Sequence, residues 1–76
     1  MSEQIFYTYI LRSKVDKDFY VGQTKDLESR VSLHNKGLVK STRYRVPFDF
    51  VYAFSFEERA DAIKFERYLK SKKKRA

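Results

Sequence analysis

Tyr7-Thr8-Tyr9 and Tyr20-Val21-Gly22, with ten residues between them, decide the fold of this chain. Each triplet lies in a short run of aromatic and β-branched residues, residues 5–11 and 19–23, and such runs are typical of strands. The segment between them is polar and suits a hairpin connection. Tyr7 and Tyr9 are two residues apart, so they share one face of the first strand. Gly22 either bends the second strand or lets another group approach its backbone closely.

A helix is predicted over about residues 25–36. Thr24 is its expected N-cap, and Gly37 is its expected C′ residue, just beyond the last turn. Residues at helical spacing give it an inward face, formed by Leu27, Val31 and His34. Arg30 lies beside this stripe. Both Arg30 and His34 are therefore expected to point toward whatever the helix packs on.

The second half of the chain predicts another strand and a longer helix. Pro47 opens a strand over residues 48–54, a position that proline tolerates. Alternation places Val51 and Ala53 on one face of it, and on the other face Phe48, Phe50, Tyr52 and Phe54. Residues 57–71 predict a helix with one side formed by Ala62, Phe65, Glu66 and Leu69.

The predicted fold class is α/β, of the α+β kind, in the order β-β-α-β-α. The hairpin and the third strand form a small three-stranded sheet, and two helices cover it. Both faces of the sheet are rich in apolar residues. One helix on each face, or both helices flanking the sheet, remain open.

The length of 76 residues predicts a single domain, 1–76, with a core over about residues 5–71 and a basic tail over residues 72–76. There is no cysteine, so stability has to come from packing, and six tyrosines and seven phenylalanines are the obvious source. The N-terminal residues do not form a signal peptide, and no apolar stretch approaches the length of a membrane span. We therefore expect a cytoplasmic protein with no membrane partner.

The formal charge of +7 indicates a polyanionic partner, most simply nucleic acid. Lys72 to Arg75 carry four of these charges, so the remainder of the chain is only modestly basic. In the loop over residues 36–45, Tyr44 lies among cationic side chains, as on many nucleic-acid-binding surfaces. A solvated loop without a partner explains this composition equally well. The loop residues expected to bind nucleic acid are Lys36, Lys40, Arg43 and Arg45.

Glu66 is the residue that most strongly indicates chemistry. It lies on the apolar side of its helix, where a carboxylate is costly unless it is paired or bound to a metal. Mg²⁺ is typically held by one or two carboxylates together with waters and a substrate phosphate, so Glu66 is a candidate ligand for Mg²⁺ or Mn²⁺. The alternative is a salt bridge to Lys70, its i+4 neighbour, and for a glutamate taken alone this is the commoner case.

Arg30 is a candidate clamp for a scissile phosphate, and its alternative is an ordinary helix arginine paired with Asp26. His34 is a candidate to hold or shuttle a proton, and its alternative is a buried interface histidine. A tyrosine acts as a general base only if a cation or metal depresses its pKa, normally about 10. Tyr9 beside Arg30 and a metal on Glu66 would meet that condition.

Other chemistries lack their residues. With one histidine and no cysteine, the chain cannot supply the ligands of a typical zinc hydrolase or a cysteine–histidine pair. With Gly22 and Gly37 as its only glycines, it has no glycine-rich phosphate cradle.

Taken together, these residues resemble the GIY-YIG endonuclease family. Tyr7-Thr8-Tyr9 stands where the first motif would be and retains its last residue, while Tyr20-Val21-Gly22 matches the second motif closely. The Pro47 strand and the helix with Ala62, Glu66 and Lys70 look like the family's later half. The resemblance covers about residues 5–71 and is closest to the small stand-alone bacterial proteins of the family. The same module is the catalytic part of the excision-repair nuclease.

The resemblance implies a three-stranded antiparallel sheet flanked by helices, and hydrolysis of a phosphodiester with one divalent ion, Mg²⁺ or Mn²⁺. Carried over, Tyr9 would activate the attacking water or serve as the base, and Tyr20 would orient the phosphate. Arg30 would stabilise the developing negative charge, and Glu66 would hold the ion. His34 stands where several members place a tyrosine or histidine near the active site.

The sequence therefore predicts a divalent-metal-dependent endonuclease acting on DNA, in repair or recombination. Gln23 stands where some members have a lysine facing the phosphate, so it joins the expected nucleic-acid-binding residues. We expect no second domain to select DNA, so specificity would come from a protein partner or a homodimer. The alternatives are a non-catalytic nucleic-acid-binding domain on the same scaffold and a small protein-interaction adaptor.

Overall fold

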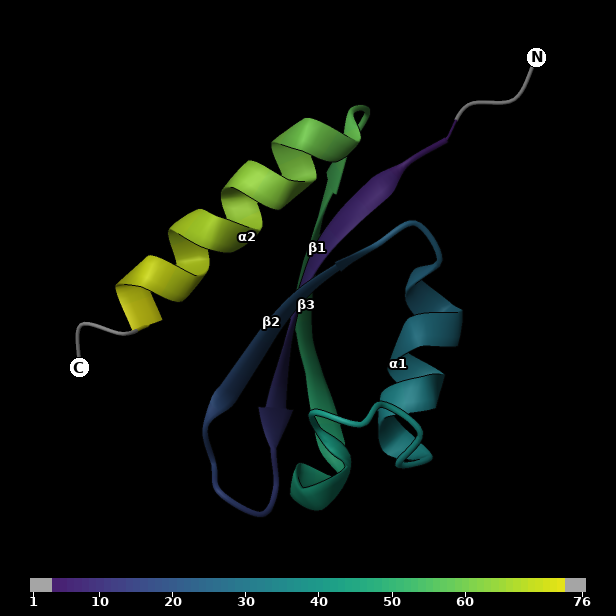
Figure 1. The fold of residues 1–76 in the computed structure, drawn as a ribbon, viewed down its shortest axis with the longest axis vertical. Helices are drawn as coiled ribbons and strands as arrows, with labels where there is room; N and C mark the ends of the chain where they lie inside the picture. Colours follow the sequence, from purple (N-terminus) through teal and green to yellow (C-terminus); the bar gives the residue numbers. More distant parts are fainter. Residues whose placement is uncertain (1–3, 74–76) are drawn as a thin grey trace.

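The computed structural model describes residues 4–73. Three antiparallel strands form one sheet in the order β2-β1-β3, and they are β1 (Phe6–Ser13), β2 (Phe19–Thr24) and β3 (Phe48–Phe56). Helices α1 (Leu27–Asn35) and α2 (Arg59–Lys73) lie on opposite sides of this sheet (Figure 1). The observed order confirms the predicted α+β fold, and of the two arrangements left open it has one helix on each face. The end of the predicted basic tail, residues 74–76, lies outside the described residues.

Two further features complete this outline. A short 3₁₀ helix, η1 (Arg43–Arg45), lies within the loop that had been expected to be irregular. Within residues 4–73, neither long helix has the length and apolar character needed to cross a bilayer.

Helix α1 begins later than predicted because Asp26, and not Thr24, caps its N-terminus. The Asp26 carboxylate accepts a hydrogen bond from the Ser29 backbone N–H at 3.3 Å. Thr24 lies two residues earlier, and its hydroxyl accepts a hydrogen bond from the Asp26 N–H at 3.1 Å. Both residue types are good caps, so the sequence alone did not distinguish them.

Helix α1 ends at the glycine predicted for this role. Gly37 has φ of +75°, and its N–H donates to the His34 carbonyl at 3.0 Å. The Leu38 N–H donates to the Leu33 carbonyl at 3.0 Å. These two bonds form a Schellman motif, in which glycine supplies the left-handed conformation. The motif fixes the direction in which the chain leaves α1 for the loop before β3.

The predicted faces of β3 are wrong because β3 contains a bulge. Leu11 pairs with Phe50 and Ile10 with Tyr52, so Val51 has no partner on β1. Ile10 and Leu11 are neighbours on β1, so they point to opposite faces, and their partners on β3 do the same. Phe50 therefore lies on the α1 side with Leu11, and Tyr52 lies on the α2 side with Ile10. The extra residue therefore splits the set that simple alternation had placed together, which was Phe48, Phe50, Tyr52 and Phe54.

The sheet has a thin core on each face. On the α1 side the buried hydrophobic residues are Tyr9, Leu11 and Phe48, with Leu27 and Val31 of α1 packed against them. On the α2 side, the hydroxyl of buried Thr8 donates to the Ala62 carbonyl at 2.7 Å. The Phe54 and Phe65 rings meet there at a centroid distance of 4.6 Å. Each helix is thus held to its own face, and β1 lies at the centre of both cores.

Candidate active site

Tyr9 is a buried tyrosine in the middle of β1, and its ring crosses the neighbouring strand β2. Its register partner is Gly22, and a Cβ at Gly22 would overlap the Tyr9 hydroxyl and lie 2.5 Å from the ring carbon Cζ. Glycine at this position therefore leaves room for the tyrosine ring. This is the close approach expected for Gly22, and it places the Tyr9 hydroxyl over the edge strand of the sheet.

The Tyr9 hydroxyl forms a hydrogen bond with His34 of α1. The Tyr9 oxygen lies 2.9 Å from His34 Nε2, and the other ring nitrogen, Nδ1, lies 2.8 Å from the hydroxyl oxygen of Thr42. Tyr20 of β2 packs against both rings, with centroid distances of 4.9 Å to His34 and 6.2 Å to Tyr9. Tyr9, His34 and Thr42 are each no more than 1% exposed. The structure thus brings Tyr9, Tyr20 and His34 together, as the sequence predicted.

The buried pair is neutral at neutral pH. Burial raises the pKa of Tyr9 to about 12, against the opposing effect of a hydrogen bond and positive charge from Arg30. Burial also lowers the pKa of His34 to about 4, and the positive charge of Arg30 acts in the same direction. Arg30 by itself therefore does not depress the pKa of Tyr9 below its usual value, because the desolvation of a phenolate outweighs it.

Arg30 and Glu66 approach this pair from the two helices. Both influence the pKa of Tyr9, Arg30 by hydrogen bonding and charge and Glu66 by charge. Arg30 therefore lies beside the Tyr9 hydroxyl, and Glu66 lies within range of an electrostatic effect on it, although α1 and α2 cover opposite faces of the sheet. Among the ion pairs formed by residues 4–73, none joins Arg30 to Asp26. The Arg30 guanidinium is thus not neutralised by the carboxylate one turn before it.

Glu66 does form the salt bridge considered as its alternative role. Its carboxylate lies 2.9 Å from Lys70 Nζ. The Lys70 side chain is 48% exposed, so the pair faces water and contributes at most about 1 kcal/mol. A metal cation could therefore replace Lys70 as the partner of the Glu66 carboxylate at little cost.

Glu66 does not belong to a closed cage of metal ligands among the described residues. Within the described part of the chain, no three His, Cys, Asp or Glu side chains gather at one point. Glu66 alone fits Mg²⁺ or Mn²⁺, which keep several waters and bind substrate phosphate. Zn²⁺ would need more protein ligands.

Gln23 of β2 adds an unsatisfied donor on the α2 side of the sheet, the side from which Glu66 comes. It pairs in the sheet with Thr8, whose hydroxyl bonds to Ala62, one helical turn before Glu66. The Gln23 amide nitrogen is buried and has no hydrogen-bond partner among the described residues. A buried donor without a partner is costly, and a phosphate oxygen would satisfy it.

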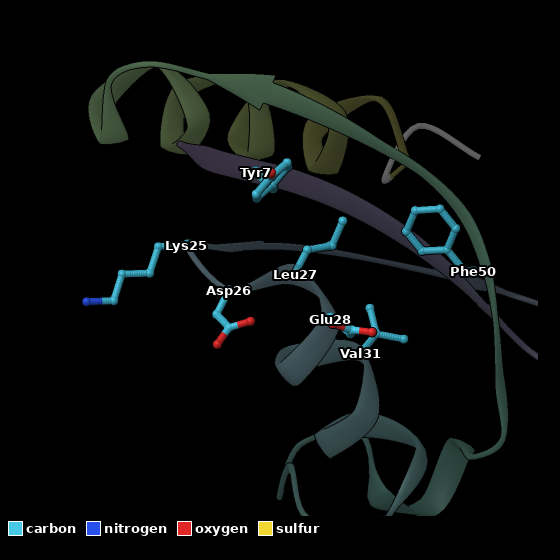
Figure 2. Close-up of a pocket in the computed structure, with 7 residues that line it drawn as sticks. All are labelled: Tyr7, Lys25, Asp26, Leu27, Glu28, Val31 and Phe50. Atoms are coloured by element: carbon cyan, nitrogen blue, oxygen red, sulfur yellow. The ribbon is translucent and has the colours of Figure 1, made fainter. Parts of the chain in front are cut away.

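Tyr7 shares the α1 side of β1 with Tyr9 but opens into a different space. It lines a hollow of about 570 Å³ between the strands and the first turns of α1 (Figure 2). The other lining residues are Lys25, Asp26, Leu27, Glu28, Val31 and Phe50. Neither Tyr9 nor Glu66 lines this hollow, so the hollow is separate from the cluster of Tyr9, Tyr20 and His34.

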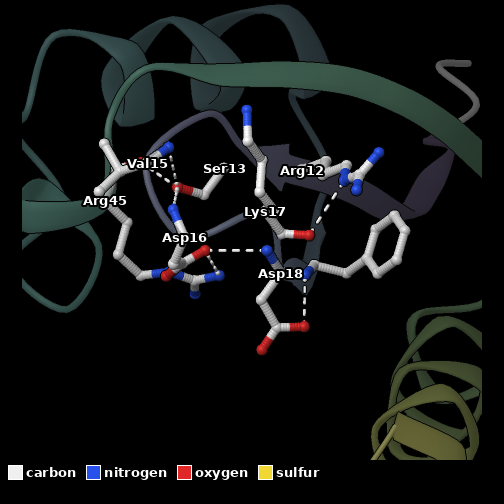
Figure 3. Close-up of polar contacts among 8 residues, drawn as sticks. Arg12, Ser13, Val15, Asp16, Lys17, Asp18 and Arg45 are labelled. Carbon is white, nitrogen blue, oxygen red and sulfur yellow. Dashed lines mark hydrogen bonds and ion pairs between the residues drawn. The ribbon is translucent and has the colours of Figure 1, made fainter.

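Arg45 of the basic loop has partners within the protein (Figure 3). Its guanidinium lies 2.6 Å from the Asp16 carboxylate, and its carbonyl accepts the Ser13 hydroxyl at 2.6 Å. The hydrogen bond from Arg45 lowers the pKa of Asp16 to about 2. These contacts fasten the loop to the β1–β2 turn. Lys36, Lys40 and Arg43 are exposed, and their binding of nucleic acid stays a prediction.

Comparison with known proteins agrees with this geometry. Residues 5–76 match the family model described as the GIY-YIG catalytic domain. The chain belongs to the GIY-YIG family. Membership in the GIY-YIG family indicates a nuclease domain with a nucleic acid substrate.

Among GIY-YIG proteins, the chain is similar to small stand-alone bacterial UPF0213 proteins, as the motifs suggested. It is 38% identical to one from Streptococcus pneumoniae serotype 4, over 90% of this chain and 69% of the relative. It is 38% identical to another from Streptococcus pyogenes serotype M3, over 100% of this chain and 83% of the relative. The solution NMR structure of the UPF0213 protein from Bacillus halodurans has a TM-score of 0.56 and 35% identity, covering 88% of this chain and 71% of that one.

Thr42 is the member of the buried cluster that the sequence analysis missed. It stands in a polar, basic loop, where a threonine is normally exposed. The loop folds back from Gly37, and the Thr42 N–H donates to the Val39 carbonyl at 3.0 Å. Only this turn brings Thr42 to His34, and no pattern in the sequence marks it.

Proposed function

We propose that this protein is a divalent-metal-dependent endonuclease that hydrolyses phosphodiester bonds in DNA and acts in repair or recombination. The observation that carries the proposal is the Tyr9 hydroxyl, buried 2.9 Å from the neutral His34 Nε2 and acted on by Arg30 and Glu66. A hydroxyl in this position can accept a proton from an attacking water while it passes its own proton to the imidazole. Its placement beside an arginine suits a reaction at a phosphate.

In this proposal, Arg30 binds the scissile phosphate and stabilises the negative charge that develops on it. The bound phosphate would also cancel part of the positive charge that lowers the pKa of His34. Substrate binding would then make His34 a better proton acceptor for Tyr9. Tyr20, packed against His34, would orient the phosphate from the β2 side.

Glu66 would hold Mg²⁺ or Mn²⁺, which supplies polarisation of a phosphoryl oxygen and stabilisation of the leaving group. The unpaired amide of Gln23 would donate to a phosphate oxygen beside it. Lys36, Lys40 and Arg43 would contact flanking phosphates. A protein partner or a second copy of the chain would supply the choice of DNA structure.

The experiment is nicking of labelled branched, flapped and single-stranded DNAs with Mn²⁺, by wild type and by Glu66→Gln. The substitution keeps the size of the side chain and removes its charge. We expect cleavage by the wild type, its loss on adding a chelator, and a fall of at least about 100-fold in the variant. Glu57→Gln, at an exposed glutamate just before α2, is the matched control and should cut as the wild type does.

The second candidate is a non-catalytic nucleic-acid-binding domain on the same scaffold. It is favoured by the Glu66–Lys70 ion pair, which gives the carboxylate a structural partner. In that case, DNA or RNA binding would weaken with salt and be insensitive to chelator, and no DNA of the panel would be cut.

A further inference from the structure

The hydrogen bonds around His34 allow its single proton to be located. Tyr9 is only 1% exposed, so its hydroxyl proton needs an acceptor inside the protein. Arg30, beside it, offers only donors. Among the described residues, the acceptor within hydrogen-bond distance of Tyr9 is His34 Nε2, at 2.9 Å. Tyr9 therefore donates to Nε2, and Nε2 carries no proton.

The proton of the neutral imidazole must then be on Nδ1. It points at the hydroxyl oxygen of Thr42, 2.8 Å away. The Thr42 hydroxyl can in turn donate to the Val39 carbonyl, at 3.4 Å. In this arrangement each proton from Tyr9 to Val39 has an acceptor. In the reverse arrangement, His34 would donate to Tyr9 and leave the tyrosine proton buried without one.

We propose that Thr42 is a positioning residue that holds His34 as its Nδ1–H tautomer and so keeps Nε2 free to accept the proton of Tyr9. Thr42 touches neither DNA nor the reacting atoms in this scheme and acts through His34 alone. Its importance for cleavage rests on the proposed function, while its effect on the tautomer does not. A ring held in the wrong tautomer loses its role as a base even where its position is kept.

Among residues 4–73, the hydrogen-bond partner of Nδ1 is the Thr42 hydroxyl. Replacing it by a methyl group of the same size, in Thr42→Val, would leave a buried Nδ1–H without a partner. The ring would then lose its preference for the Nδ1–H tautomer, because each tautomer would leave one buried donor unpaired, Nδ1–H in one case and the Tyr9 hydroxyl in the other. Thr42→Ser keeps the hydroxyl and should keep the native tautomer.

The test is the tautomeric state of His34, measured at pH 7 by NMR on protein labelled with ¹⁵N-histidine. His34 is the only histidine of the chain, so the spectrum needs no assignment. We expect Nδ1 protonated and Nε2 bare in the wild type and in Thr42→Ser, and a mixture of both tautomers in Thr42→Val. A wild type protonated at Nε2 would overturn the proposal whatever the variants do. An unchanged tautomer in folded Thr42→Val would overturn it as well.

Cleavage provides the second readout. With Mn²⁺, we expect nicking by Thr42→Val to fall about 10–100-fold, the range seen when the partner orienting a functional histidine is removed, and Thr42→Ser to restore most of it. Equal loss in both variants would contradict a role through the hydroxyl. Absence of cleavage by the wild type, with the expected tautomers present, would refute the proposed function and leave the assignment of Thr42 supported.

Discussion

Gly22 leaves room for the Tyr9 ring, His34 Nε2 lies 2.9 Å from the Tyr9 hydroxyl, and Arg30 lies beside that hydroxyl. Each of these contacts depends on a single residue. Tyr9, Arg30 and His34 could be predicted because the motif spacing and the helical stripe mark them. That Gly22 makes room for the Tyr9 ring could be predicted only as one of two possibilities. Thr42 could not be predicted, because its burial depends on a turn with no pattern of its own.

Gly22→Ala should damage the site and the fold together. The added methyl would overlap the Tyr9 hydroxyl, and such overpacking costs about 1–3 kcal/mol. We expect a lower free energy of unfolding in urea and loss of nicking, since Tyr9 must move away from His34.

Gly37→Ala is the matched control for this substitution. A Cβ at Gly37 meets nothing within 4 Å, but φ of +75° is strained for alanine by about 1 kcal/mol. The free energy of unfolding should fall while nicking is retained. Full loss of nicking in Gly37→Ala, or full activity in Gly22→Ala, would contradict the role given to Gly22.

His34 should make stability depend on pH between about 4 and 6.5. Its pKa is lowered from 6.5 to about 4 in the folded state, so the unfolded chain binds the extra proton in this window. The free energy of unfolding should therefore rise with pH through the window by at most about 3 kcal/mol. Above pH 6.5 this contribution from His34 should be complete. The pKa of Asp16 is lowered from 3.8 to about 2, so Asp16 changes the free energy of unfolding only below this pH range.

The pH dependence is checked by chemical unfolding at a series of pH values. His34→Gln should be less stable at neutral pH and should show a flatter curve between pH 4 and 6.5. A wild-type curve that is already flat in this range would show that His34 titrates normally in the folded protein.

At the scale of elements, the order and length of strands and helices were predictable, and the faces of β3 were not. Aromatic and β-branched runs mark strands wherever they lie, so β1, β2 and β3 were found within two residues of their ends. The bulge opposite Ile10 and Leu11 reflects how β3 fits against β1, which no periodicity within β3 records. The N-cap of α1 was misplaced for a similar reason, since Thr24 and Asp26 are both capable caps.

The loop between α1 and β3 should carry much of the salt dependence of DNA binding. Replacing Lys36, Lys40 and Arg43 by glutamine removes three exposed charges. If each contacts one phosphate, the slope of log affinity against log salt should flatten by about 3. The measurement is a titration of the same labelled DNA at several salt concentrations.

Arg45→Gln is the control within the same loop. Because Arg45 pairs with Asp16, its loss should lower stability and leave the salt slope nearly unchanged. A larger change in slope for Arg45→Gln than for the triple variant would contradict the assignment of these residues.

At the scale of the whole molecule, the sheet serves as the frame that lets two helices on opposite faces supply one site. The Tyr9 hydroxyl reaches over the edge strand β2, where α1 contributes Arg30 and His34 and α2 contributes Glu66. The formal charge of +7 favours binding of a polyanion without specifying a site on the molecule. We therefore assign the proposed chemistry to the edge of the sheet, and the proposed attraction for nucleic acid to the surface charge.

The most direct test of this account is the rate of Mn²⁺-dependent nicking by Tyr9→Phe beside the wild type. Phenylalanine keeps the ring that fills the space over Gly22 and removes only the hydroxyl, so the fold should survive, as thermal unfolding would verify. Loss of a group that transfers protons typically costs about 10²–10⁴-fold in rate, and we predict a fall in this range. A folded Tyr9→Phe protein that nicks DNA at the wild-type rate would contradict the assignment of the active site.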